Sequence, residues 1–465
     1  MLFDRGLSPE VDIIAFYQKL STTGDRRIRY SQAANSSYPQ QYIQAAFPQR
    51  RTKRQKNIPE TKTQSHSGQY FHSPIWSCLF HISMQNGIMY SRLLKPTEGK
   101  SFFLFGPRGT GKTTWVKTEF PGALYLDLLE AELFNDLLAN PQRLERLIPK
   151  EFRDWIIIDE VQKIPSLLDE VHRLIERDRL RFILTGSSAR KLRRGGHNLL
   201  AGRALTHSFY PLTATELGRD FRLDYSLAYG QLPSAYTEAK PGAYLESYVR
   251  TYLQEEVREE GLTRNLAGFA RFLEAASFSQ GSLLNITSVA RECGVERKVV
   301  ENYFGILEDL LIAYRLPVFA RRSRRRMVAH DKFYFFDAGV YRTLRPRGAL
   351  DMPEEIEGAA LETLFLQELV ALNALLNKRY TIHYWRTAAG IEVDFVLYGA
   401  RGLLAFEVKR SSRVTAETLR GLKAFRADYP MARAVLIYGG RRELNEGGIR
   451  VLPAEAAFRG LQDLL

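Results

Sequence analysis

The sequence has only two cysteines, Cys78 and Cys293, and they lie far apart in the chain. This scarcity excludes a disulfide framework and a cysteine-based metal site, and it suits a reducing compartment. No apolar run approaches the length of a membrane span. The N-terminus does not show a basic start followed by an apolar core, so we find no secretion signal. The expected location is therefore cytoplasmic.

Acidic residues are also in short supply relative to basic ones. The chain has 52 Asp and Glu against 66 Lys and Arg, which gives a formal net charge of +14. This excess favours a polyanionic partner, either nucleic acid or a membrane surface, and charge alone does not choose between them. The length of 465 residues is sufficient for about three domains.

Residues 1–88 lack sustained apolar periodicity and are rich in Gln, Ser, Pro and Thr, a composition typical of disorder. They contain eleven Lys or Arg and five Asp or Glu. One interpretation is a basic regulatory or nucleic-acid-binding arm. The other, which we favour, is an extension with no fold of its own.

The stretch from Ser101 to Thr114 has the sequence SFFLFGPRGTGKTT, an apolar run followed by the spacing G-x-x-x-x-G-K-T. This pattern predicts a strand, a phosphate-binding loop and a helix. Glycines let backbone N–H groups approach phosphates, Lys112 can reach the β- and γ-phosphates, and Thr113 can ligate Mg²⁺. The predicted cofactors are ATP and Mg²⁺. The predicted nucleotide-binding residues are Gly106, Pro107, Arg108, Gly109, Thr110, Gly111, Lys112, Thr113 and Thr114.

A second apolar strand is predicted within residues 154–162, DWIIIDEVQ, and it ends in Asp159 and Glu160. A continuous apolar run is typical of a central parallel strand, and ligands bind at the carboxyl ends of such strands. Asp159 can hold Mg²⁺ through water, and Glu160 can polarise the attacking water. The alternative is an acidic strand end that caps the next helix.

Polar residues follow the next apolar strand, which begins at Arg181. Ser187, with Thr185 and Ser188, could sense the γ-phosphate; the alternative is a serine-rich turn. Arg203, in LAGRA, could contact a transition-state phosphate in the same chain or in a neighbouring subunit, or it could form a surface salt bridge.

Residues 89–465 resemble the prokaryotic P-loop ATPases of the AAA+ superfamily that carry a C-terminal domain of unknown function. The resemblance rests on FLFGPRGTGKTT, WIIIDEVQK, FILTGSSARKL, LAGRA and FYPLTATEL, which occur in that order. It implies a sheet with the Walker-type strand order, in which the P-loop strand is central. It does not cover residues 1–88, and it implies no biological task.

A helix-turn-helix is predicted from Leu283, after a helical segment over residues 240–280. Thr287 can cap the first helix, and Ala290, Gly294 and Val300 have the spacing of the motif. A β-hairpin, that is a wing, is expected next, and arginines at its tip suit phosphate contacts. The alternatives are a solvated loop and a protein-interaction module. The arginines are Arg321, Arg322, Arg324, Arg325 and Arg326.

Near the C-terminus a hairpin is predicted around GARG, with paired residues summing to 801 if the turn centres between Ala400 and Arg401. Asp394 would then face Glu407, with Lys409 on the same face. Two opposed carboxylates repel unless a cation lies between them, and Mg²⁺ is the natural one. The alternative is a half-buried hairpin with surface charges.

The arrangement E…D…E-x-K resembles the PD-(D/E)xK nuclease core, here Glu362, Asp394, Glu407 and Lys409, although Val393 replaces the usual proline. We therefore predict an α/β protein with four parts: a disordered basic extension (1–88), an AAA+ P-loop ATPase domain (89–235), a helical linker with a winged helix (236–345), and a nuclease-like domain (346–465).

The predicted function is ATP hydrolysis that drives or gates an action on DNA, or on a protein partner. The expected contacts with DNA are the winged helix and Arg321–Arg326; a homo-oligomer is compatible with the sequence and no membrane partner is expected. The alternative is a nucleotide-switched regulator without nuclease activity.

Overall fold

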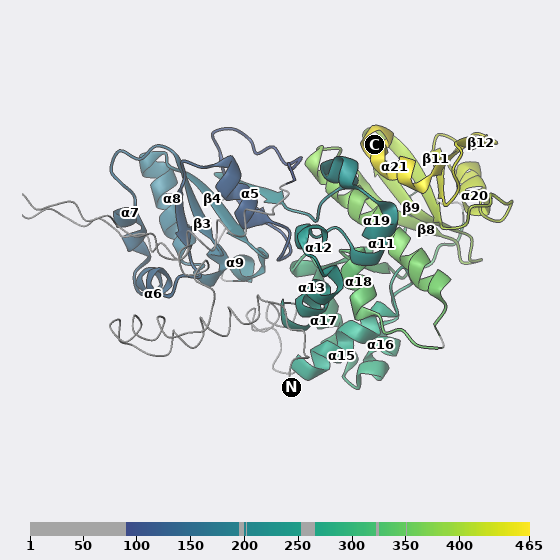
Figure 1. Ribbon diagram of the computed structural model, residues 1–465, viewed down its shortest axis with the longest axis horizontal. Coiled ribbons are helices and arrows are strands. Elements are labelled where there is room, and N and C mark those ends of the chain that lie inside the picture. The colour runs from purple at the N-terminus through teal and green to yellow at the C-terminus, as the bar shows by residue number, and fades with distance from the viewer. Residues whose placement is uncertain (1–89, 195–199, 201, 253–265, 322–324, 350) are drawn as a thin grey trace, which may run out of the picture. The chain divides into compact units, whose positions relative to one another are not determined.

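The structure is a computed structural model, and it describes residues 90–194, 200, 202–252, 266–321, 325–349 and 351–465 (Figure 1). The predicted extension, 1–88, lies outside these described residues. The same is true of Arg322 and Arg324, and of residues 253–265 in the predicted helical segment.

The first described domain is built on a parallel sheet of five strands in the order β2-β3-β4-β1-β5. The P-loop strand β1 is therefore interior, between the middle strand β4 and the edge strand β5. The strands are β1 (Ser101–Phe105), β2 (Leu124–Asp127), β3 (Trp155–Asp159), β4 (Arg181–Gly186) and β5 (Ala204–Ser208).

Helices cover both faces of this sheet, because successive strand residues point to opposite sides. Phe102 and Leu104 pack with Trp115 of α5 (Lys112–Glu119). Phe103 and Phe105 belong to the core on the other face, with α6 (Ala131–Ala139) and α8 (Leu167–Asp178). Shorter elements complete the domain: η1 (Pro141–Arg143), α7 (Leu144–Leu147), η2 (Val161–Lys163), α9 (Arg190–Arg194), α10 (Ala214–Leu217) and η3 (Gly218–Asp220).

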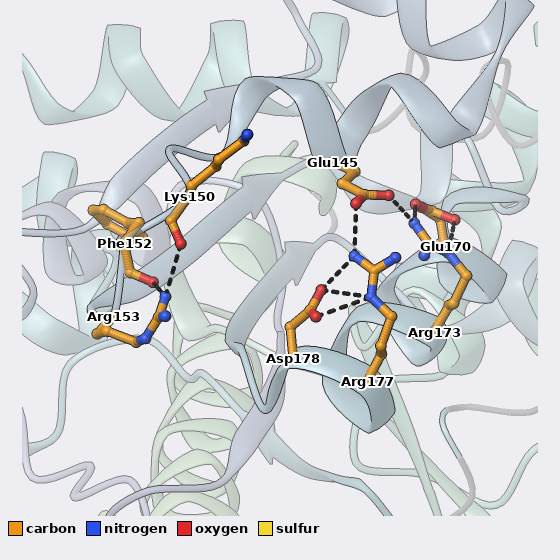
Figure 2. Close-up of polar contacts among 8 residues, drawn as sticks. All are labelled: Glu145, Lys150, Phe152, Arg153, Glu170, Arg173, Arg177 and Asp178. Carbon is orange, nitrogen blue, oxygen red and sulfur yellow. Dashed lines mark hydrogen bonds and ion pairs between the residues drawn. The ribbon is translucent and has the colours of Figure 1, made fainter.

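An ion-pair network joins α7 to α8 at the surface (Figure 2). Glu145 accepts from Arg177 at 2.6 Å and also pairs with Arg173, and these two arginines bind Asp178 and Glu170 of their own helix. The arginines lower the pKa of Glu145. Exposed pairs contribute little to stability, so the apolar core positions α8 and the network fixes its outer face.

The middle segment is mainly helical. It contains α11 (Leu223–Tyr229), α12 (Pro233–Thr237), α13 (Pro241–Ser247), the π-helix η4 (Tyr248–Tyr252), α15 (Leu266–Ser277), α16 (Ile286–Cys293), α17 (Arg297–Asp309), strands β6 (Ala313–Leu316) and β7 (Lys332–Phe335), and α18 (Ala338–Leu344). The helix-turn-helix prediction is confirmed in α16 and α17, with Gly294 at the turn (φ +65°). Asn285, not Thr287, caps α16, because its side chain accepts from Ser288 N at 3.1 Å.

The C-terminal segment forms a mixed sheet of six strands in the order β12-β13-β11-β10-β9-β8. Helix α19 covers one face and α20 the other, so Phe395 and Phe406 pack with α19, and Val396 and Ala405 pack with α20. The elements are α19 (Pro353–Leu375), β8 (Thr381–Arg386), β9 (Glu392–Gly399), β10 (Gly402–Lys409), α20 (Arg420–Asp428), β11 (Arg433–Tyr438), β12 (Leu444–Glu446), β13 (Ile449–Pro453), α21 (Ala454–Arg459) and α22 (Leu461–Leu464).

Helix α19 contradicts the expectation that no apolar run approaches the length of a membrane span. Among the described residues it is long and apolar enough to cross a membrane by length and composition, whereas we expected no such run. Its most apolar window is 61% buried inside the fold, and its side chains share one core with the middle segment and the C-terminal sheet. The helix is apolar because it is a core helix.

Candidate nucleotide-binding site and C-terminal carboxylate site

The P-loop prediction is confirmed as a strand, a loop and a helix. The loop leaves β1 after Phe105, and Gly109 and Gly111 adopt φ of +80° and +89°, which only glycine adopts without strain. Lys112 Nζ donates to the carbonyl oxygens of Gly106 at 2.7 Å and Pro107 at 3.1 Å. The loop carbonyls therefore hold the Lys112 ammonium at the loop, where it can reach a bound phosphate.

Asp159 lies beside the start of α5. Thr113 Oγ1 donates to Asp159 Oδ2 at 2.8 Å, and Thr185 donates to Oδ1. The carboxyl ends of β3 and β4 and the P-loop thus converge on one carboxylate. A hydroxyl and a carboxylate are oxygen donors that fit Mg²⁺. Sequence reasoning missed Tyr125, whose hydroxyl also donates to Asp159; burial, and then the Asp159 charge, raises its pKa.

Glu160 follows Asp159 with φ +59°, a left-handed conformation unusual for a side chain with a Cβ. Burial raises the pKa of its carboxyl group, while the nearby Lys112 acts in the opposite direction. Gln162 Nε2 donates to this carboxylate and, at 3.4 Å, to Ser187 Oγ. The predicted sensor Ser187 is therefore connected to Glu160 through Gln162, a residue that the motifs did not single out.

Arg203 lies at the wrong edge of the sheet for an action on its own P-loop. It precedes β5, which runs parallel to β1 with Ala204 beside Ser101, whereas the P-loop follows the other end of β1. Arg203 pairs with Glu176 at the surface instead. The same-chain role is wrong in this arrangement, and the role in a neighbouring subunit stays a prediction.

Two side chains from outside the motif hold the backbone of the P-loop. Arg92 Nη1 donates to Thr110 O at 2.8 Å, and the Tyr248 hydroxyl donates to Arg108 O at 2.9 Å. Arg92 also forms a buried ion pair with Glu216 at 3.0 Å and lies 4.0 Å over the Phe209 ring. The site thus depends on residues before β1 and in η4.

The predicted register of the C-terminal hairpin is confirmed as far as the strands pair. Gly399 pairs with Gly402 and Phe395 with Phe406, so paired residues sum to 801 as expected. The ladder ends there, because Val408 N donates to the Asp394 side chain at 2.9 Å. Lys409 Nζ lies between the two acids, 3.2 Å from Asp394 Oδ2 and 2.7 Å from Glu407 Oε1.

Two further residues of this site come from β7, and sequence reasoning missed both. Lys332 pairs with Glu392 and lies 3.8 Å from Asp394 Oδ1. The Tyr334 hydroxyl donates to Glu362 Oε2 at 2.9 Å. The structure thus brings all four predicted residues into one electrostatic cluster with Lys332.

The pKa values of the three acids diverge. Burial raises the pKa of Glu362 to about 7 and that of Glu407 to about 8, in both cases helped by the Asp394 charge. Burial also opposes ionisation of Asp394, yet the Lys409 and Lys332 ammonium groups hold its pKa below the usual value. Asp394 therefore loses its proton before Glu362 and Glu407 as the pH rises.

A divalent cation bound in this cluster would have few ligands from the protein. Within the described part of the chain, no group of three or more His, Cys, Asp or Glu is arranged to hold a metal. However, Glu407 Oε2 is buried and has no hydrogen-bond partner among the described residues, and Mg²⁺ commonly uses one or two carboxylates with water. Asp394 and Glu407 therefore fit Mg²⁺ as a two-carboxylate site.

The arginine-rich loop between β6 and β7 does not extend from the helix-turn-helix as a free tip. Phe319 N donates to Tyr384 O at 2.6 Å and Ala388 N donates to Arg326 O at 2.8 Å, so the loop between β6 and β7 follows the edge strand β8. Arg325 Nε lies 2.8 Å from Asp428 Oδ2, and Arg321 lies 4.8 Å over the Tyr398 ring. The described residues on either side of positions 322–324 therefore lie on the surface of the C-terminal sheet.

Three family models match consecutive parts of the chain. Residues 98–218 match the AAA domain, residues 220–351 match the domain of unknown function DUF8612, and residues 357–457 match the domain of unknown function DUF4143. The search of curated proteins gave no match.

Two solved structures show a remote likeness. The Orc1 protein of Aeropyrum pernix, solved in complex with DNA, is 17% identical over 54% of this chain and 86% of that chain, with a TM-score of 0.22. Protein VC1899 from Vibrio cholerae is 13% identical over 74% of this chain and 96% of that chain, with a TM-score of 0.20. At such scores neither carries an argument about this chain.

Proposed function

We propose that this chain, whose residues 98–218 match the AAA domain and whose residues 357–457 match DUF4143, is a P-loop ATPase. It binds ATP with Mg²⁺, hydrolyses it, and uses the cycle to drive or gate an action on DNA. The observation that carries the proposal is the convergence of Lys112, Thr113, Asp159 and Glu160 at one edge of the parallel sheet. The expected location is cytoplasmic.

Each residue of the nucleotide site has its own proposed role in hydrolysis. Thr113 and Asp159 would hold Mg²⁺, which neutralises phosphate charge when bound. Lys112 exchanges the loop carbonyls of Gly106 and Pro107 for phosphate oxygens. Glu160 orients a water molecule and accepts its proton as the water oxygen bonds to the γ-phosphorus and the bond to the ADP oxygen breaks. In a homo-oligomer, Arg203 of a neighbouring subunit is the proposed cation for the transition state.

The proposed DNA contacts are the α16–α17 helix pair and the arginine loop along β8. The side chains of Arg325 and Arg326 are exposed, and net charge favours a polyanion. Because the loop lies on the C-terminal sheet, DNA bound there would reach the nuclease-like domain.

Neutralising all five loop arginines to Gln is expected to reduce the slope of log affinity against log salt by about two to four, since each phosphate contact contributes close to 0.9. The measurement is fluorescence anisotropy with duplex DNA at several salt concentrations. Deletion of residues 1–88 is the control, because that segment is also basic. An unchanged slope in the arginine variant would mean that the loop does not touch phosphates.

For the C-terminal domain we propose a PD-(D/E)xK-like site in which Asp394 and Glu407 would hold Mg²⁺ and supply it to a phosphodiester. Lys409 positions water or stabilises developing charge, and Glu362 is the fourth member of the cluster. The second candidate function is a nucleotide-switched regulator that binds DNA or a protein without cleavage. The observation that favours it is the pairing of the carboxylates with Lys409 and Lys332.

Incubation of the full chain with supercoiled plasmid and Mg²⁺ separates these two functions. A nuclease would nick the plasmid, and Glu407→Ala would lose at least about 100-fold of that activity because a metal ligand is gone. The matched control is Glu443→Ala, an exposed glutamate on the same domain. A gel shift without nicking in the wild type selects the regulator and rejects the nuclease.

A further inference from the structure

Lys332 lies beside the carboxylate cluster. Its side chain is only 3% exposed, which is unusual for a lysine. Its ammonium pairs with Glu392 and lies 3.8 Å from Asp394 Oδ1. A buried ammonium is costly unless carboxylates compensate it. The position of Lys332 therefore depends on the acids of the C-terminal domain.

The backbone that carries Lys332 belongs to the middle segment. Lys332 pairs with Leu316 of β6 and forms a bridge with Leu283, just before the helix-turn-helix. Leu284 N donates to Asp331 O at 2.8 Å, which fixes the start of β7 to the same segment. The middle segment thus supplies one charge of the C-terminal site.

The described residues surround this ammonium with both acids and bases, and it lies 5.7 Å from the centre of the Tyr384 ring. Glu392 is shared with Arg386 at 2.7 Å, and Asp394 is shared with Lys409 at 3.2 Å. Glu362 and Glu407 are the remaining acids, and the Tyr334 hydroxyl is the neutral donor to Glu362. Lys332 and Lys409 hold positive charge on both oxygens of Asp394, where a divalent cation would also bind.

We propose that Lys332 competes with a divalent cation for Asp394, so that the middle segment sets how readily the C-terminal site takes up a metal. This inference rests on the two-carboxylate site of the proposed function. Like charges at close range repel strongly where water is excluded. A metal ion can enter only as the Lys332 ammonium retreats from Asp394, and a movement of β7 would therefore change metal occupancy.

The test is Mn²⁺ binding to the full chain without nucleotide, followed by electron paramagnetic resonance of free Mn²⁺ for the wild type, Lys332→Met and Lys332→Gln. Lys332→Met removes the charge and keeps the length of the side chain. Lys332→Gln is the alternative if the methionine variant does not fold, because its amide still donates to Glu392. Each variant is also made with Asp394→Asn, which isolates the binding that depends on Asp394. Lys423→Met, on the exposed side of α20, is the matched control.

We expect Mn²⁺ binding that depends on Asp394 to tighten by at least about tenfold in the Lys332 variants, because one positive charge leaves the site. Lys423→Met should match the wild type. The wild type could show Mn²⁺ binding that depends on Asp394, with the same affinity in a folded Lys332 variant. That result would overturn this inference but not the metal site of the proposed function. Absence of such binding in both the wild type and the folded variants would overturn the metal site of the proposed function, and this inference with it.

Discussion

Glu160→Gln is expected to keep ATP binding and to lose hydrolysis by roughly 10²- to 10⁴-fold, the contribution of a positioned acid–base group. The carboxylate is held at the end of β3, close to Lys112, and Gln162 links it to Ser187. Glutamine keeps the shape and the Gln162 contact but cannot accept a proton. The loss should therefore appear in kcat rather than in nucleotide affinity.

Lys112→Ala is the complementary change and should abolish binding itself. The Lys112 ammonium bonds two loop carbonyls, so alanine removes both the phosphate ligand and the group around which the loop folds. Binding is measured with a fluorescent ATP analogue and hydrolysis by phosphate release. Glu119→Gln, exposed at the end of α5, is the matched control. Near wild-type turnover in Glu160→Gln would remove Glu160 from the mechanism.

The nucleotide site could be predicted because its determinants are local in sequence. Five consecutive apolar or small residues predict β1, and a glycine spacing predicts the loop directly after it. Asp159 and Glu160 follow from the same logic, since parallel strands end at one edge of a sheet. Arg92 and Tyr248 could not be predicted, because each reaches the loop from a segment with no motif of its own.

In the carboxylate cluster, too, the residue that the sequence could not predict comes from a distant segment of the chain. A two-residue turn determined the register, so arithmetic predicted the pairs from Gly399 with Gly402 to Phe395 with Phe406, which bring Asp394 and Glu407 close together. Lys332 lies 62 positions before Asp394 in the chain and is brought there only by tertiary packing of β7. Its one sequence signal was a lysine in an apolar run, KFYFF, where a buried charge needs a partner.

The arginine loop and the α16 cap show where composition misleads. Five arginines suggested a free basic tip, but Tyr398 and Asp428 each hold one of them against the C-terminal sheet. Thr287 had the right side chain for a cap, yet Asn285 lies two residues earlier and takes the role. In both cases the residue type was informative and its partner was set by packing.

Arg92→Met is expected to destabilise the ATPase domain by about 3–5 kcal/mol, the cost of leaving a buried charge without its partner. The Arg92 side chain is 6% exposed and that of Glu216 is 0% exposed, so water cannot replace the guanidinium. Glu216 would keep Leu93 N and Thr213 N as donors, at 2.7 and 2.9 Å, but not a compensating cation. ATP affinity should fall as well, because Arg92 Nη1 no longer holds Thr110 O.

The double variant Arg92→Met with Glu216→Gln identifies the cause. Glutamine removes the charge but has one acceptor oxygen for two backbone donors, Leu93 N and Thr213 N, so the double variant should recover part of the stability without recovering ATP affinity. Arg219→Met, exposed on the same segment, should stay within about 0.5 kcal/mol of the wild type. Urea and thermal unfolding of the full chain provide the measurement. Glu216→Gln alone measures the cost of the lost acceptor. If the losses of the two single variants add up in the double variant, the loss in Arg92→Met comes from packing on Phe209 rather than from the unpaired charge.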